Sequence, residues 1–203
     1  MKESKLYLFD MDGVLFNTKL NMEKSWNEVR KKFKLQIKFE NYFRHIGIPF
    51  EKILKKLKIY KDIKKIKNYY QYQSIRHQNL VKIYPGVSLA INKLLKKGHA
   101  VGVVTSKDYK RTNKLIIKYK LKFSVIQCPT VNLRGKPYPD TILKAISQTK
   151  FKKKDVVYVG DTNNDFLSAR SAKINFIYAN YGYGKIKAKK VQSISKIIDL
   201  VHK

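Results

Sequence analysis

The sequence is poor in cysteine, in acidic residues and in long hydrophobic runs. Cys128 is the single cysteine, which excludes a disulfide within the chain and a metal site built from cysteines. It follows the apolar stretch "FSVIQ" and is expected to be a packing residue rather than a nucleophile. No stretch approaches the roughly 18 uninterrupted apolar residues of a membrane span, and Asp10 interrupts the N-terminal apolar run where a signal peptide would need continuity. We therefore expect a soluble, cytoplasmic protein with no membrane partner.

Acidic residues number 14, against 45 Lys and Arg in 203 residues, so the formal net charge is +31. Such a charge is common in proteins that bind nucleic acid. However, 6 of the basic residues are arginine, the residue preferred for two-point recognition of phosphate, and the lysines are spread along the whole chain. We interpret the charge mainly as a solvated surface that attracts anionic ligands, and we do not expect nucleic acid as a partner.

Five short runs rich in β-branched and aromatic residues alternate with helical patterns. They span residues 6–9, 100–105, 123–128, 156–160 and 174–179. Apolar runs of this length between helices are typical of a parallel sheet covered on both faces. The sequence predicts a doubly wound, Rossmann-like α/β fold with five parallel strands, and a last helix within "ISKIIDLV" at residues 194–201.

A long insertion separates the first two predicted strands. A crossover needs about a dozen residues, whereas residues 17–84 intervene here, with apolar side chains three and four apart. We predict an α/β core domain formed by residues 1–16 and 85–203, and a helical domain formed by residues 17–84 with Trp26 in its core. Monomer and homodimer both remain open.

Four of the scarce aspartates follow predicted strands. Asp10 and Asp12 follow the first strand, Asp161 follows the fourth, and Asp165 lies four residues later. Because ligands of such sheets bind at the carboxyl ends of the strands, we expect these acids to converge there. Neighbouring carboxylates repel each other unless a cation holds them ionised, and an all-oxygen ligand set favours Mg²⁺. The sequence therefore predicts a magnesium site.

Three more polar residues are expected at the same edge of the sheet. Thr105 and Ser106 end the second predicted strand, and Lys136, in "RGKPYPD", lies in the loop after the third. A cation, a lysine and a hydroxyl around one carboxylate can position a phosphoryl group and neutralise its charge. The combination favours phosphoryl transfer.

In this order the motifs resemble those of the haloacid dehalogenase superfamily of phosphohydrolases, over nearly the whole chain. The stretches "DMDGV", "VVTS", the lysine of "GKPYPD", and "VGDTNND" are similar to its first, second, third and fourth motifs. The helical insertion resembles the cap domain of the phosphoglycolate phosphatase and β-phosphoglucomutase branch. The resemblance implies the same α/β fold and phosphatase activity.

The resemblance also implies a role for each motif residue. Asp10 would be the nucleophile that forms an aspartyl-phosphate, and Asp12 would act as general acid and then general base. Thr105 and Lys136 would be catalytic residues that hold the transferring phosphoryl oxygens, with Lys136 also offsetting the negative charge around Asp10, and Ser106 would bind substrate.

The metal ligands follow from the same resemblance. Mg²⁺ would be bound by the Asp10 carboxylate, the Asp12 backbone carbonyl and Asp161, with Asp165 close to the ion or bound through water.

Two loops are similar to substrate loops of the family. The stretch "FRHIGIPF", residues 43–50, resembles the cap loop over the active site, which makes Arg44 and His45 substrate-binding candidates, with a solvated helix end as the alternative. The stretch "NYGYG", residues 180–184, resembles a glycine-containing loop common after the last strand, and an exposed turn is an equally good interpretation.

The expected substrate is a small phosphorylated metabolite: phosphoglycolate, or a sugar, polyol or amino-alcohol phosphate. A sugar-phosphate mutase of the β-phosphoglucomutase type would use the same motifs. A phosphatase for nucleotides or nucleic-acid ends would use the basic surface as a groove. A non-catalytic binding module is less well supported, because no motif residue is missing.

Overall fold

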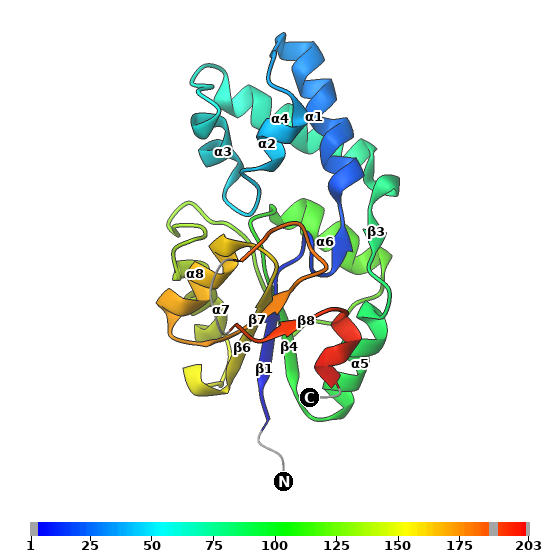
Figure 1. Ribbon diagram of the computed structural model, residues 1–203, viewed down its shortest axis with the longest axis vertical. Helices are drawn as coiled ribbons and strands as arrows, with labels where there is room; N and C mark the ends of the chain where they lie inside the picture. Colours follow the sequence, from blue (N-terminus) through cyan, green and yellow to red (C-terminus); the bar gives the residue numbers. More distant parts are fainter. Residues whose placement is uncertain (1–3, 187–190, 202–203) are drawn as a thin grey trace.

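The computed structural model describes residues 4–186 and 191–201, which form an α/β core with a helical insertion above it (Figure 1). The central sheet is parallel and has the strand order β5-β4-β1-β6-β7-β8. Its strands are β1 (Leu6–Phe9), β4 (Ala100–Val104), β5 (Val125–Gln127), β6 (Val156–Gly160), β7 (Asn175–Ala179) and β8 (Ser193–Ile194). The predicted α/β class is confirmed.

Helices cover both faces of the sheet, which explains why the central strands β1, β4 and β6 are almost entirely apolar. They are α5 (Val87–Lys96), α6 (Tyr109–Lys118), α7 (Asp140–Ser147), α8 (Asn163–Ala172), and the 3₁₀ helices η2 (Lys153–Asp155) and η3 (Ile197–Val201). One apolar cluster joins the sheet to α5, α6 and η3, and a second joins it to α7 and α8. Successive residues of β1 face opposite clusters, as the alternation of side chains in a strand requires.

The C-terminal segment corrects two expectations. The sheet has six strands rather than five, because Ser193 and Ile194 pair with Tyr178 and Ala179 as β8. The predicted last helix is a short 3₁₀ helix, η3. Strand pairing takes the start of the segment "ISKIIDLV", so five residues are left for the helix.

The helical insertion has its own apolar core. It consists of α1 (Lys19–Phe33), α2 (Phe39–Phe43), α3 (Phe50–Lys56), α4 (Ile63–Arg76) and the 3₁₀ helix η1 (Gln78–Leu80). A two-stranded antiparallel ribbon, β2 (Phe16–Asn17) with β3 (Lys82–Ile83), joins the insertion to the core. Trp26 is fully buried in the core of the insertion and stacks on Tyr42, with ring centroids 4.6 Å apart.

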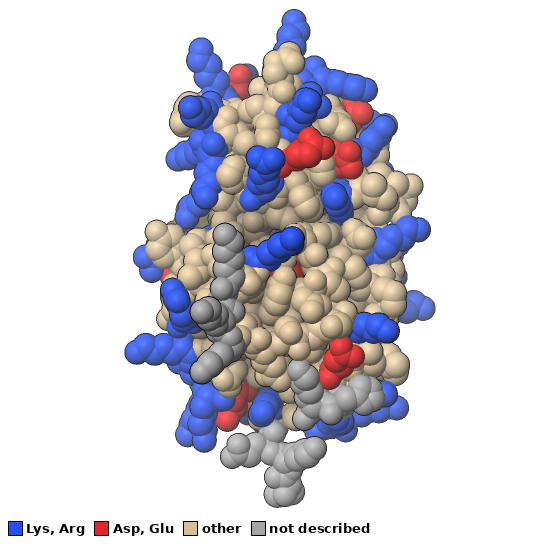
Figure 2. Space-filling view, viewed as in Figure 1, with Lys and Arg blue, Asp and Glu red and all other residues tan. Residues whose placement is uncertain are grey.

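Basic side chains extend from both the core and the insertion on the face shown in Figure 2, and they do not gather in one patch. This distribution agrees with a solvated surface. Cys128 is buried directly after β5, as expected of a packing residue. Within residues 4–186 and 191–201, none of the helices combines the length and apolar character needed to cross a bilayer.

The contribution of the insertion core to stability can be tested by substitution. Trp26→Ala should lower the free energy of unfolding by about 3–5 kcal/mol, because it removes a fully buried aromatic side chain. Leu20→Ala, on the same helix but 60% exposed, should change it by less than about 0.5 kcal/mol. Urea unfolding followed by far-ultraviolet circular dichroism measures both variants. Equal effects of the two substitutions would contradict the packing described here.

Candidate active site

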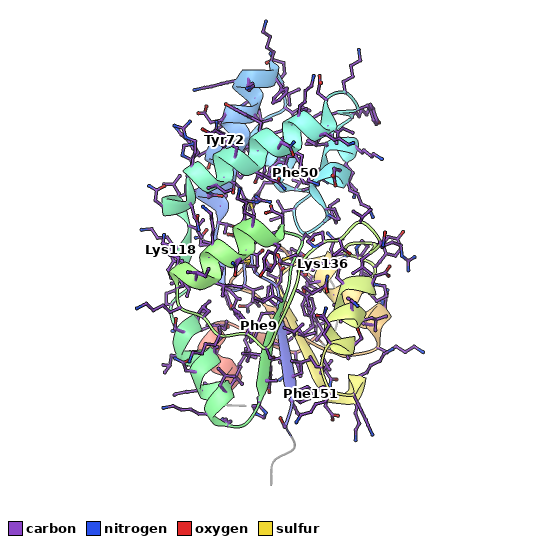
Figure 3. All side chains as sticks on the ribbon, turned by 180° about the vertical axis from the view of Figure 1, so that it is seen from behind. Phe9, Phe50, Tyr72, Lys118, Lys136 and Phe151 are labelled. Carbon is purple, nitrogen blue, oxygen red and sulfur yellow. The ribbon has the colours of Figure 1, made fainter. Side chains whose placement is uncertain are left out.

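The carboxyl ends of β1, β4 and β6 meet directly beneath the helical insertion (Figure 1). Asp10 follows β1, Thr105 follows β4, and Asp161 follows β6. Lys136 comes from the loop between β5 and α7, and it lies closer to the insertion than Phe9 of β1 does (Figure 3). The parallel topology thus collects residues that are far apart in the sequence.

Lys136 is held between two buried carboxylates. Its Nζ lies 2.8 Å from Asp10 Oδ1 and 2.7 Å from Asp165 Oδ1. Asp165 also lies in the first turn of α8: its Oδ2 accepts from the Thr162 N–H at 2.9 Å and the Thr162 hydroxyl at 2.6 Å, in a capping box. Burial alone would lower the pKa of Lys136, but the attraction of Asp10 and Asp165 raises it above its ordinary value. The lysine is therefore a fixed positive charge beside Asp10.

Asp161 has an oxygen that lacks a partner among the described residues. Its Oδ2 accepts from the Tyr183 N–H at 2.7 Å, whereas its Oδ1 is buried without a hydrogen bond. A Cβ at Gly13 or Gly182 would overlap the Asp161 side chain, so these glycines allow the loops to close around it.

The carboxylates of Asp10, Asp161 and Asp165 fit a divalent cation. One oxygen from each of the three lies within 4.8 Å of the others. Burial raises the pKa of Asp10 to about 7 against the opposing charge of Lys136, with Asp165 and Asp12 adding to the rise. Burial, followed by Asp165 and Asp10, also raises the pKa of Asp161 well above its ordinary value. A cation at the unpartnered Asp161 oxygen would stabilise the ionised carboxylates, and hard oxygen donors suit Mg²⁺.

Asp165 differs from the other two carboxylates because protein donors already occupy both of its oxygens. Besides Lys136 and Thr162, the Tyr158 hydroxyl donates to its Oδ1 at 3.1 Å. These contacts make Asp165 the residue that orients Lys136. Any contact of Asp165 with a metal ion would compete with them.

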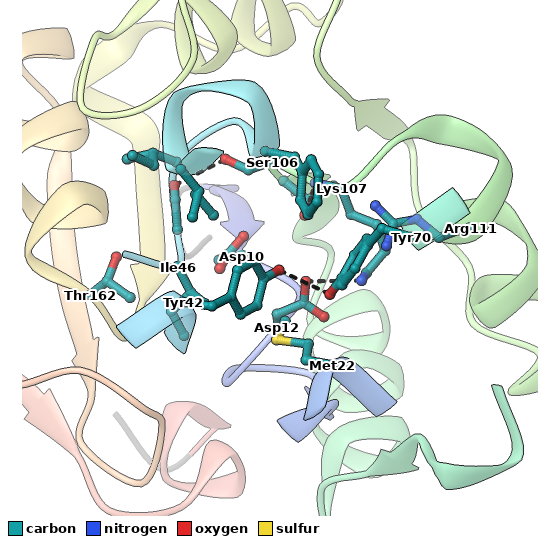
Figure 4. Close-up of a pocket in the computed structure, with 15 residues that line it drawn as sticks. Asp10, Asp12, Met22, Tyr42, Ile46, Tyr70, Ser106, Lys107, Arg111 and Thr162 are labelled. Carbon is teal, nitrogen blue, oxygen red and sulfur yellow. Dashed lines mark hydrogen bonds and ion pairs between the residues drawn. The ribbon is translucent and has the colours of Figure 1, made fainter. Parts of the chain in front are cut away.

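Asp12 points into a small cavity between the core and the insertion (Figure 4). Its Oδ2 lies 3.0 Å from the buried Lys107 Nζ, and its Oδ1 has no hydrogen-bond partner among the described residues. The cavity is about 50 Å³ in volume. Its lining residues are Asp10, Asp12, Met22, Tyr42, Ile46, Gly47, Ile48, Phe50, Ile53, Tyr70, Thr105, Ser106, Lys107, Arg111 and Thr162.

The structure brings most of the predicted site residues together. Asp10, Asp12, Thr105 and Ser106 line the cavity, while Lys136, Asp161 and Asp165 adjoin Asp10. The Ser106 hydroxyl donates to the Gly47 carbonyl of the insertion at 3.0 Å, so the predicted loop at residues 43–50 does lie over the sheet edge.

Arg44 and His45 are not among the cavity-lining residues. Arg44 is exposed and His45 is partly exposed. Their role in substrate binding stays a prediction, and the residues of this loop that reach the cavity are Ile46, Gly47 and Ile48.

Three residues of the site were missed by sequence reasoning. Lys107 and Arg111 line the cavity, but nothing in the sequence distinguishes them from the other basic residues, which together number 45. Tyr183, in "NYGYG", bonds to Asp161 through its N–H, its hydroxyl accepts from the Thr18 N–H, and its ring lies 5.2 Å from that of Phe43. The glycines on either side of Tyr183 are the sequence feature that could have indicated a loop packed closely against the site.

Comparison with known proteins shows the family and the fold of this chain. Residues 7–179 match the family described as haloacid dehalogenase-like hydrolase. The chain belongs to this family. The match confirms the resemblance found in the motifs, and it confirms the predicted enzyme class, a hydrolase of phosphoric esters.

Individual relatives of this hydrolase span most of its length. It is 30% identical over 173 residues to a PpaX protein of Caldanaerobacter subterraneus, covering 84% of this chain and 79% of that one. It is 29% identical over 169 residues to pyrophosphatase PpaX of Bacillus cereus, covering 81% and 78%.

Solved structures share the fold of this hydrolase. A hydrolase from Pseudomonas syringae superimposes with a TM-score of 0.87 at 21% identity, over 98% of this chain and 97% of that one. CbbY from Rhodobacter sphaeroides, solved in complex with phosphate, superimposes with a TM-score of 0.85 at 17% identity, over 98% and 96%.

The buried position of Lys136 makes its contribution to stability measurable. Lys136→Met should lower the free energy of unfolding by about 3–5 kcal/mol, because two buried carboxylates lose their shared cation. Arg134→Met, which removes an exposed ion pair with Asp140 from the same loop, should leave it nearly unchanged. Urea unfolding of both variants checks the contrast, and a negligible effect of Lys136→Met would refute it.

Proposed function

We propose that this hydrolase is a Mg²⁺-dependent phosphatase that hydrolyses small phosphorylated compounds through a phosphoryl-aspartate at Asp10. The observation that carries the proposal is the position of Asp10. It lies at the cavity wall, its Oδ1 is fixed by Lys136, and the unpartnered Asp161 oxygen belongs to the same group of carboxylates.

The known relatives support a small phosphorylated substrate. The Bacillus cereus relative is named a pyrophosphatase, and a second structure of CbbY holds xylulose-(1,5)bisphosphate. The cavity volume of about 50 Å³ also favours a small ligand when the insertion lies as it does here. Expected substrates are therefore small phosphate esters or inorganic diphosphate.

Asp10 would attack the phosphorus atom, forming an oxygen–phosphorus bond as the bond to the leaving oxygen breaks. The fixed charge of Lys136 would offset negative charge beside Asp10. The Thr105 hydroxyl accepts from the Lys107 N–H at 3.1 Å, which leaves its own proton free to donate to a phosphoryl oxygen. Each group is positioned before the substrate arrives.

Asp12 would transfer the protons. It lines the same cavity as Asp10 and has an oxygen without a hydrogen bond, which suits a group that protonates the leaving oxygen. The resulting Asp12 carboxylate would then take a proton from water as that water attacks the phosphoryl-aspartate. Phosphate is released, and Asp10 and Asp12 return to their starting forms.

Asp10, Asp161 and the Asp12 backbone carbonyl would hold Mg²⁺, with Asp165 close by or bound through water. When bound, the ion neutralises charge on the transferring phosphoryl group. Asp161 is kept in place for this role by the Tyr183 N–H and by the glycines against it.

The proposal requires the Asp10 carboxylate. Asp10→Asn should reduce phosphate release from acetyl phosphate and inorganic diphosphate to less than about one-thousandth, because the amide is a poor nucleophile. Asp62→Asn, at an ion pair on the surface of the insertion, is the matched control and should retain activity. Equal activity of the two variants in a phosphate-release assay would refute the proposal.

We expect phosphate release to require Mg²⁺ and Mg²⁺ binding to require Asp161. Removal of divalent metal with a chelator should abolish phosphate release, and added Mg²⁺ should restore it. Asp161→Asn should weaken Mg²⁺ binding by at least about tenfold, because it replaces a charged ligand. Isothermal titration calorimetry with Mg²⁺ measures this, with Asp62→Asn again as control. Unchanged Mg²⁺ affinity in Asp161→Asn would exclude this residue as a ligand.

A further inference from the structure

Two buried cations of the cavity take no part in the phosphoryl-transfer steps described above. Lys136 is not among the lining residues, so the lining cations are Lys107 and Arg111. The Lys107 and Arg111 side chains are 5% and 10% exposed, respectively. Burying a guanidinium is costly, so its position beside a ligand cavity calls for an explanation.

Arg111 is held rigidly at the junction of core and insertion. Its Nε donates to Asp108 Oδ2, its Nη1 lies 3.3 Å from the Ser74 hydroxyl of α4, and its guanidinium carbon lies 5.5 Å from the centre of the Tyr70 ring. Asp108 is not among the cavity-lining residues. The ion pair with Asp108 therefore orients the guanidinium from outside the cavity.

Hydroxyl groups add hydrogen-bond donors beside Arg111. The Tyr42 hydroxyl donates to the Tyr70 hydroxyl at 2.9 Å, which leaves the Tyr70 proton for another acceptor (Figure 4). Burial raises the pKa of both tyrosines, so both hydroxyls keep their protons. The rest of this wall is mostly apolar, formed by side chains such as Met22, Phe50 and Ile53.

We propose that Arg111, with Lys107 and the Tyr70 hydroxyl beside it, binds a second phosphoryl group of the substrate while the first lies at Asp10. This inference rests on the proposed function, and it makes small compounds with two phosphoryl groups the preferred substrates. Arg111 is thus a specificity residue: its planar fork suits two phosphate oxygens, and a neutral leaving group gains nothing from it.

The shared cavity selects among such compounds. Asp10 and Arg111 line one small cavity, so both phosphoryl groups would be bound in it, which favours two directly linked groups over two separated by a carbon chain. Lys107 pairs with Asp12 at 3.0 Å, which holds its charge at the cavity wall.

Measurements of ligand affinity test the second phosphoryl site without requiring turnover. In the presence of Mg²⁺, imidodiphosphate should bind the unmodified protein at least about tenfold more tightly than inorganic phosphate. Arg111→Gln should remove most of this difference while leaving the affinity for inorganic phosphate within about twofold. Arg111→Lys, which keeps the charge, should recover part of it. A pentitol bisphosphate, as the longer ligand, should bind more weakly than imidodiphosphate, and the reverse order would overturn the choice of directly linked groups.

Gln71→Ala separates recognition from a purely structural role of Arg111. Gln71 of α4 donates to Asp108 Oδ2 at 3.1 Å, so its loss loosens the same junction without removing a cation. The Gln71→Ala variant should bind imidodiphosphate and inorganic phosphate as tightly as the unmodified protein does. If Gln71→Ala behaves like Arg111→Gln, or if Arg111→Gln weakens both ligands equally, Arg111 is a structural tether and the proposal is overturned.

Hydrolysis of acetyl phosphate, whose leaving group carries no second phosphoryl group, distinguishes the two proposals. Turnover of acetyl phosphate with equal affinities for imidodiphosphate and phosphate would refute the second phosphoryl site alone. Absence of any hydrolysis, with the expected order of affinities and its loss in Arg111→Gln, would refute the phosphatase and leave the second site standing.

Discussion

The buried contact of Lys136 with Asp10 and Asp165 is the constraint on which the site depends. It brings a loop, the end of β1 and the start of α8 to one point, and each partner would be costly to bury alone. Asp165 serves two purposes, because the carboxylate that caps α8 also orients the lysine. The contact that anchors the loop of Lys136 therefore also fixes a positive charge beside Asp10.

The insertion completes the site by supplying the apolar wall of the cavity. It touches the core at several separate points: Gly47 accepts from Ser106, Ser74 lies beside Arg111, and the Phe43 ring lies against Tyr183. Excluding water from the cavity strengthens every electrostatic interaction inside it. Movement of the insertion would therefore change both access to Asp10 and the strength of the charges around it.

Burial distinguishes three cations of the candidate site from the other basic residues of this chain. Most of the basic residues that the structure describes are exposed or half-buried lysines, which water and salt screen. Lys107, Arg111 and Lys136 differ because each lies against a carboxylate within the protein. The surface charge can attract anions in general, whereas ion pairs hold these three cations at fixed positions beside Asp10 and the cavity.

The sequence by itself determined the α/β class, the insertion and the edge of the sheet at which Asp10, Asp161 and Lys136 meet, because strand patterns and parallel topology are local properties with a fixed geometric consequence. The sixth strand was decided by tertiary pairing, which takes Ser193 and Ile194 and leaves only residues 197–201 of the predicted helix helical. The tertiary structure also determined which residues form the cavity wall, because this depends on how the insertion folds over the core. It alone placed Arg111 in that wall, since no local pattern marks one basic residue among many.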